Sequence, residues 1–132
     1  MIKGIAHAAY TVGDMEATLR FYCKQLGFTH AFSIDDAEGK PWIEYVKVAD
    51  GQFLEFFYPQ EGYRPEKGSY MHLCLEVDDI YGTAANLEAA GVTVRVPPRQ
   101  GRDTNWQCWA DDPDGNPIEF MQIGKDAPQA RA

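Results

Sequence analysis

An internal repeat of imidazole and carboxylate side chains is the feature that most limits what this chain can fold into. His72 follows His7 by 65 residues, and Glu119 follows Glu55 by 64 residues. Each His lies in an apolar stretch that opens one half of the chain, and each Glu lies in an apolar stretch that closes it. The chain is therefore predicted to contain two copies of one structural unit.

Both halves share the element order strand, helix, strand, strand, strand. Asp14 in the first half, and Asp78 or Asp79 in the second, precede apolar residues at helical spacing and are candidate N-caps. Gly27 and Gly91 are placed to end the two helices in a left-handed turn. Strands are expected at 2–10, 28–34, 42–49 and 52–58, and again at 69–77, 92–96, 105–110 and 117–123.

The length of 132 residues fits one domain or two very small modules. We predict an α+β fold in which two tandem βαβββ modules, residues 1–58 and 69–123, form a curved mixed sheet. Residues 59–68 are expected to link the modules, and residues 124–132 to form a flexible tail.

The composition excludes several classes of partner. A net charge of −8 argues against nucleic acid and anionic membranes, which both attract clustered Lys and Arg. No apolar run approaches a membrane span, and the first residues lack a signal-peptide pattern. The widely spaced Cys23, Cys74 and Cys108 are no disulfide framework. We expect them to be small buried residues in a cytoplasmic protein.

Strand alternation suggests what the repeated residues do. Side chains two apart on a strand share a face, so His72 and Glu119 are expected on the sheet face away from the helix, with Phe53 and Glu55 matched in the first half. An ionised carboxylate in an apolar strand is costly unless it is compensated. Two carboxylates, each repeated with a His, predict that His7, Glu55, His72 and Glu119 bind one metal ion, which the sheet would enclose.

Two imidazoles and two carboxylates suit a divalent ion such as Zn, Ni, Co, Mn or Fe. The set lacks a thiolate, which argues against a structural zinc site and favours a Lewis acid acting on a small-molecule substrate. For the substrate we select the apolar Phe53 and Trp106 as wall residues and Arg102 as a loop cation. His30 has no repeat partner and is expected to be a surface or structural residue.

Further motifs surround these residues: Val12-Gly13-Asp14-Met15-Glu16, Phe21-Tyr22, Leu26-Gly27-Phe28, Phe53-Leu54-Glu55, His72 to Asp79 and Asp112 to Phe120. With them the chain resembles the vicinal-oxygen-chelate superfamily, the glyoxalase, bleomycin-resistance and extradiol dioxygenase group, over roughly residues 2–123. Within the group, the His–Glu–His–Glu order is similar to glyoxalase I, a lactoylglutathione lyase.

The resemblance implies a lyase or isomerase acting on a 2-oxoaldehyde-derived or related vicinal-oxygen substrate by proton transfer through an enediolate. It also implies that Glu119, and secondarily Glu55, are the catalytic carboxylates, and that the protein is a homodimer. Bacterial glyoxalase I carries an Arg for glutathione shortly after its first His, where this chain has Thr11. Whether glutathione or another thiol takes part therefore stays open.

Two alternatives remain within the same superfamily. One is a different metal enzyme: an epimerase, a dioxygenase or an antibiotic-resistance transferase. The other is a metal-free, bleomycin-type drug-binding protein, with which the 13% aromatic content is compatible.

Overall fold

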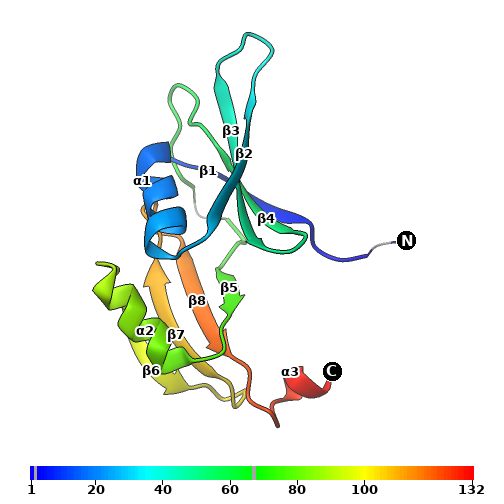
Figure 1. The fold of residues 1–132 in the computed structure, drawn as a ribbon, viewed down its shortest axis with the longest axis vertical. Coiled ribbons are helices and arrows are strands. Elements are labelled where there is room, and N and C mark those ends of the chain that lie inside the picture. Colours follow the sequence, from blue (N-terminus) through cyan, green and yellow to red (C-terminus); the bar gives the residue numbers. More distant parts are fainter. Residues whose placement is uncertain (2, 67) are drawn as a thin grey trace. The chain divides into compact units, whose positions relative to one another are not determined.

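The structure, a computed structural model, describes residues 1, 3–66 and 68–132. Residue 2, where the first strand is predicted to begin, and residue 67 of the predicted linker lie outside the described residues. The chain divides into two units, Met1–Glu66 and Lys67–Ala132. Each unit contains one four-stranded mixed sheet and one main helical segment (Figure 1). The α+β class and the repeated element order are therefore confirmed.

In the first unit the strand order is β1-β4-β3-β2, with β1 parallel to β4 and the other pairs antiparallel. Helix α1 continues into a wider π-helical turn, η1, in which the N–H of Leu26 bonds the carbonyl of Phe21 at 2.9 Å. The elements are β1 His7–Thr11, α1 Met15–Leu19, η1 Arg20–Gln25, β2 Thr29–Asp35, β3 Pro41–Ala49 and β4 Gln52–Phe57.

The second unit repeats this topology, with strand order β5-β8-β7-β6 and β5 parallel to β8. Within the segment expected to form a tail, Pro128–Arg131 forms a short helix, α3. The other elements are β5 Leu73–Glu76, α2 Ile80–Ala89, β6 Val96–Gln100, β7 Trp106–Asp111 and β8 Pro117–Gln122.

The helix boundaries follow the local signals in the sequence. The Asp14 carboxylate accepts a hydrogen bond from the N–H of Ala17 at 3.0 Å. In the second unit Asp79, rather than Asp78, is the N-cap, because its carboxylate accepts from the first turn of α2. Gly27 and Gly91 have φ of 80° and 81°, the left-handed conformation that ends a helix.

The helix covers one face of each sheet, and strand alternation directs the glutamates to the other face (Figure 1). In the first unit Phe56 of β4 is fully buried and its ring centroid lies 4.8 Å from that of Tyr22 in η1. In the second, Ile118 and Phe120 of β8 are buried on the face that α2 covers. Glu55 and Glu119 alternate with these residues.

Three strands differ from their predictions. β1 begins at His7 and β5 begins at Leu73, both later than predicted, so that His72 lies just before its strand. The strand β6 differs in its position. We expected residues 92–96 to be extended and the prolines that follow to be in a loop, but β6 runs from Val96 to Gln100 and includes Pro97 and Pro98. Proline cannot donate to a sheet and is tolerated on an edge strand. β6 is such an edge, paired with β7 alone, and its register shifts between Val96 and Arg99.

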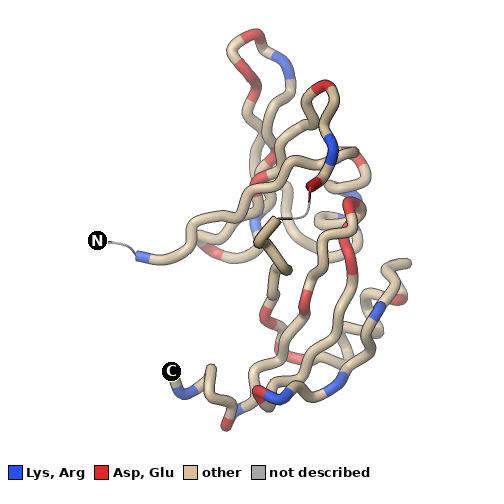
Figure 2. The backbone as a smooth tube through the Cα atoms, turned by 180° about the vertical axis from the view of Figure 1, so that it is seen from behind, with Lys and Arg blue, Asp and Glu red and all other residues tan. Residues whose placement is uncertain are grey.

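The charged residues are spread over both units, with acidic positions on helices, strands and turns (Figure 2). In the described part of the chain, no helix combines the length and apolar character needed to cross a membrane.

The cap of α2 yields a stability prediction. Asp79→Ala should lower the free energy of unfolding by about 1 kcal/mol, because the N–H groups of Tyr81 and Gly82 lose their acceptor. Urea unfolding followed by circular dichroism would measure this change. The neighbouring Asp78→Ala serves as the control and should leave the free energy within about 0.5 kcal/mol of the original. Equal effects from both substitutions would contradict the assignment of the cap.

Candidate metal centre

The first His–Glu pair lies on β1 and β4. His7 is the first residue of β1 and stands beside Phe53, so the parallel register places Glu55 two residues further along β4, next to Ala9. The Nε2 of His7 lies 3.3 Å from Oε2 of Glu55. Glu55 is only 9% exposed. This carboxylate is therefore largely withdrawn from water and depends on its neighbours for compensation.

Tyr45 of β3 supplies part of that compensation. Its hydroxyl donates to Oε1 of Glu55 at 2.6 Å, so the two carboxylate oxygens have different neighbours. The hydrogen bond to Glu55, followed by burial, raises the pKa of the Tyr45 phenol, which keeps it a donor at neutral pH. The Tyr45 ring stacks on that of Phe32 with the ring centroids 4.4 Å apart. It meets the His7 ring edge-on, with the centroids 5.9 Å apart.

The second pair repeats this arrangement. His72 immediately precedes β5, and its Nε2 lies 3.1 Å from Oε2 of Glu119 on β8. Glu119 is 5% exposed. The His72 ring meets the indole of Trp109 edge-on at 4.8 Å, and Trp109 stands opposite Glu119 in the β7–β8 register, where Tyr45 stands opposite Glu55 in the first unit.

Cys74 departs from the expectation that all three cysteines are small buried residues. It is an exposed residue next to Glu119 in the β5–β8 register, whereas Cys108 is fully buried. Although the residue as a whole is exposed, partial burial of its thiol, together with the charge of Glu119 and a hydrogen bond to that carboxylate, raises the pKa of Cys74 to about 12. The thiol is therefore protonated at neutral pH and acts as a weak donor to Glu119.

The donor atoms of each pair fit adjacent positions around a divalent ion. With bonds of about 2.1 Å and angles of 90–110°, two ligand atoms are separated by about 3.0–3.4 Å. The pairs measure 3.3 Å and 3.1 Å. In neither unit do the described residues form a cluster of three or more His, Cys, Asp or Glu suited to a metal ion. The structure thus forms the predicted ligand set as two pairs, and their meeting around one enclosed ion stays a prediction.

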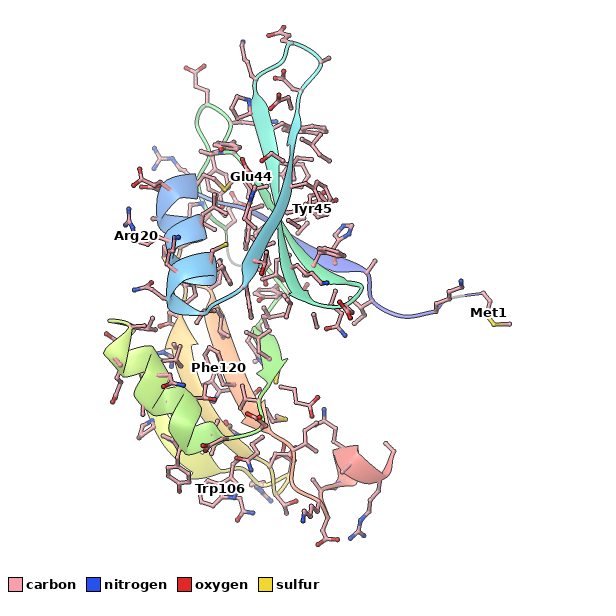
Figure 3. The ribbon with its side chains drawn as sticks, in the orientation of Figure 1. Met1, Arg20, Glu44, Tyr45, Trp106 and Phe120 are labelled. Carbon is pink, nitrogen blue, oxygen red and sulfur yellow. The ribbon has the colours of Figure 1, made fainter. Side chains whose placement is uncertain are left out.

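The candidate substrate residues differ in where they lie. Phe53 shares the face of Glu55, and its ring is 6.3 Å from that of Tyr45. Trp106 lies on the helix-covered face, as Phe120 does (Figure 3). Its ring centroid is 5.6 Å from that of Tyr81 in α2. Arg102 is exposed in the turn before β7.

Sequence reasoning missed Tyr45 and Trp109, the aromatic residues that lie beside the two pairs. Strand alternation separates the two faces of a strand, but only the register between strands shows which aromatic residue lies beside each Glu. Tyr45 and Trp109 stand opposite Glu55 and Glu119, while Trp106 is three residues from Trp109 and so faces the other way.

A second polar cluster lies on the helix-covered face of the first unit and was also missed. Glu44, next to Tyr45 on β3, points to the side of α1 (Figure 3). Its Oε2 lies 2.6 Å from Nε2 of His30 and accepts from Ser33 Oγ at 2.5 Å, while its Oε1 accepts from the Tyr58 hydroxyl at 3.0 Å. His30 is therefore a structural residue, as expected, and holds a buried carboxylate.

The hydrogen bonds of this cluster stabilise the fold and do not form a catalytic triad. Serine and imidazole both bond the same carboxylate oxygen and lie 3.4 Å from each other, so the carboxylate is not behind the imidazole as in a nucleophilic triad. Burial alone would raise the pKa of the Glu44 carboxyl, but the hydrogen bonds from Ser33, His30 and Tyr58 hold it below its ordinary value of 4.5.

Comparison with known proteins identifies the family of the chain. The sequence profile of the Glyoxalase/Bleomycin resistance protein/Dioxygenase superfamily matches residues 4–120. The chain belongs to this superfamily.

Individual relatives bear two kinds of name. The chain is 32% identical to a lactoylglutathione lyase of Haemophilus influenzae, over 89% of this chain and 91% of that protein. It is 31% identical to a probable lactoylglutathione lyase of Vibrio cholerae, over 89% of each. It is also similar to the crystal structure of TnmS3, an antibiotic binding protein from Streptomyces sp. CB03234, with a TM-score of 0.75, 29% identity and coverage of 93% of this chain and 98% of that one.

The Glu44 cluster predicts acid sensitivity. Because the pKa of Glu44 is lowered on folding, its ionised form stabilises the fold above pH 4.5, and this contribution is lost as the pH falls through the folded pKa. Between about pH 5 and pH 3, the original protein should therefore lose more unfolding free energy than Glu44→Gln does. Urea titrations at both pH values would measure the difference.

Glu38→Gln, at an exposed hairpin position, is the control and should keep the original pH dependence. The same slope in the original protein and in Glu44→Gln would show that Glu44 does not carry this effect.

Proposed function

We propose that this protein is a metal-dependent lyase or isomerase of the glyoxalase I type, acting on a 2-oxoaldehyde-derived or related vicinal-oxygen substrate. The observation that carries the proposal is the duplicated pair of a His and a buried Glu at the spacing of adjacent metal ligands. The lyase names of relatives at about 30% identity support the same reaction type.

His7, Glu55, His72 and Glu119 would hold the ion. Two neutral imidazoles and two carboxylates would leave a bound divalent ion formally neutral, which suits a site withdrawn from water. A divalent ion bound there would withdraw electron density from a substrate oxygen and so acidify the adjacent C–H. The ligand chemistry accommodates Zn, Ni, Co, Mn or Fe.

Glu119 is our first choice for the group that moves the proton, and Glu55 is the second. A carboxylate that takes a proton from one carbon and returns it to the next needs a nearly water-free setting, because bulk water would exchange the proton. Glu119, at 5% exposure beside the ring of His72, meets this condition. General-base catalysis of this kind contributes roughly 10²–10⁴-fold in rate.

Phe53 would form part of an apolar wall for the substrate, since it shares the face of Glu55. Arg102 stays a candidate for an anionic end of the substrate. Thr11 stands where bacterial glyoxalase I has its glutathione-binding Arg, and its carbonyl accepts from the Tyr63 hydroxyl at 2.7 Å. A thiol other than glutathione is therefore as compatible with the chain as glutathione.

A second candidate is a metal-free binding protein for an aromatic drug. The observation that favours it is the stacked pair of Phe32 and Tyr45, of which Phe32 is 46% exposed, together with the similarity to an antibiotic binding protein. Another metal enzyme of the same superfamily, such as an epimerase, dioxygenase or antibiotic-resistance transferase, is the remaining alternative, and the full set of two His and two Glu argues against a dioxygenase.

The proposal includes a homodimer, in which the first pair of one protomer and the second pair of its partner complete a site. It also includes a cytoplasmic location, which is supported by three cysteines that are not joined in disulfides.

The metal and the base can be tested together. The purified protein should contain about one divalent ion per chain by elemental analysis, and should turn over methylglyoxal in the presence of a thiol. Glu119→Gln should lower that turnover at least about a hundredfold while a metal still binds, because the amide cannot accept the proton. Glu88→Gln, at an exposed position of α2, should have no effect.

Unchanged turnover in Glu119→Gln would reject the role of Glu119. A protein with no bound metal, whose thermal unfolding is not shifted by Ni, Co, Zn or Mn, would favour the drug-binding candidate.

The shared site can be tested by mixing two inactive proteins. One carries His7→Ala with Glu55→Ala, and the other carries His72→Ala with Glu119→Ala. If one protomer and its partner complete each site, a dimer containing both variants has one intact site. Random pairing should then restore about a quarter of the original activity, because half of the dimers are mixed and half of their sites are intact.

No recovery after mixing, with mixed dimers verified by mass spectrometry, would place all four ligands in one chain. A monomeric mass by light scattering together with full metal binding would have the same meaning.

A further inference from the structure

The two halves keep the same ligand pair but differ at the positions beside each glutamate. On the parallel neighbour strand, Ala9 stands beside Glu55 and Cys74 beside Glu119. On the antiparallel neighbour strand, Tyr45 stands opposite Glu55 and Trp109 opposite Glu119. The two carboxylates therefore occupy matched places with unequal surroundings.

In the first unit a strong donor engages the carboxylate. The Tyr45 hydroxyl bonds Oε1 of Glu55 at 2.6 Å, which leaves Oε2 as the oxygen facing His7 at 3.3 Å. The phenol ring is itself held in place by the stacked ring of Phe32 at 4.4 Å and by the edge of Phe53 at 6.3 Å. A hydroxyl mounted on a packed ring fixes the carboxylate plane more firmly than a donor on a flexible side chain would.

In the second unit the matched ring is engaged elsewhere. The indole N–H of Trp109 donates to Oε1 of Gln107 at 2.7 Å, and its ring lies against His72. Glu119 instead has the thiol of Cys74 beside it, and a thiol is a weak donor.

From this difference we infer that Tyr45 is a positioning residue that holds Glu55 in the orientation of a fixed metal ligand, a role that Trp109 does not play for Glu119. The inference rests on the proposed metal site. It makes the two carboxylates unequal: Glu55 is anchored through Oε1, and Glu119 keeps more freedom to change its orientation. Tyr45 acts through Glu55 and touches neither the metal nor the reacting carbons.

The test is the affinity of the metal-free, full-length protein for Co²⁺, measured by isothermal titration calorimetry. Tyr45→Phe removes the hydroxyl and keeps the ring packed against Phe32. The affinity should fall about 10- to 100-fold, as is usual when a group that orients a metal ligand is lost. The visible absorption of the Co²⁺ complex should also change, because Glu55 no longer has a single fixed orientation.

Tyr58→Phe is the matched control. It removes a hydroxyl that donates to Glu44, a buried carboxylate of the same unit on the opposite sheet face. Its Co²⁺ affinity and spectrum should match those of the original protein. Thermal unfolding without metal would confirm that both variants fold.

Each result has a distinct meaning. Weaker binding in Tyr45→Phe alone supports the positioning role. Equal affinity in Tyr45→Phe and the original protein overturns this role while the proposed function stands, and so does an equal loss in both variants. No Co²⁺ binding by the original protein overturns the proposed metal site itself, and the inference with it.

Discussion

The pairing of a buried carboxylate with an imidazole on the face away from the helix is the interaction on which the rest of this structure depends. Glu55 and Glu119 are 9% and 5% exposed, and a carboxylate so far withdrawn from water destabilises a fold unless donors or cations compensate it. One His and one further donor are close to each carboxylate: the Tyr45 hydroxyl in the first unit and the Cys74 thiol in the second. This compensation is local, so each unit can form its pair by itself.

Much of the fold and of the candidate site is predictable from the sequence, because the signals are local and doubled. Asp14 as an N-cap and glycines at left-handed helix ends mark the boundaries, and the matched His and Glu reveal the pairs. The position of strand β6 was predicted wrongly because its prolines have two local interpretations. Pro97 and Pro98 suggest a loop, yet an edge strand tolerates proline because it needs fewer donors.

The residues that sequence reasoning missed depend on pairing between strands, which a single sequence does not record. Tyr45 stands beside Glu55, and Trp109 beside Glu119, only because of the register between neighbouring strands. A change of one residue would turn each ring to the helix-covered face, where Trp106 lies. Glu44 shows the same dependence, since its partners His30 and Ser33 come from the adjacent strand.

A single His–Glu pair offers a cation two protein ligands, and the rest of its coordination shell would be water. Two pairs acting on one ion bind more tightly than their separate affinities suggest, because the second pair meets an ion that the first already holds. The gain depends on how closely the two pairs are kept together. An ion bound by all four ligands would in turn stabilise the arrangement that unites the pairs, by a free energy that grows with the logarithm of its concentration over its dissociation constant. At the proposed site, metal affinity and assembly would then be two measures of one equilibrium, and a substitution that loosens one pair would weaken both.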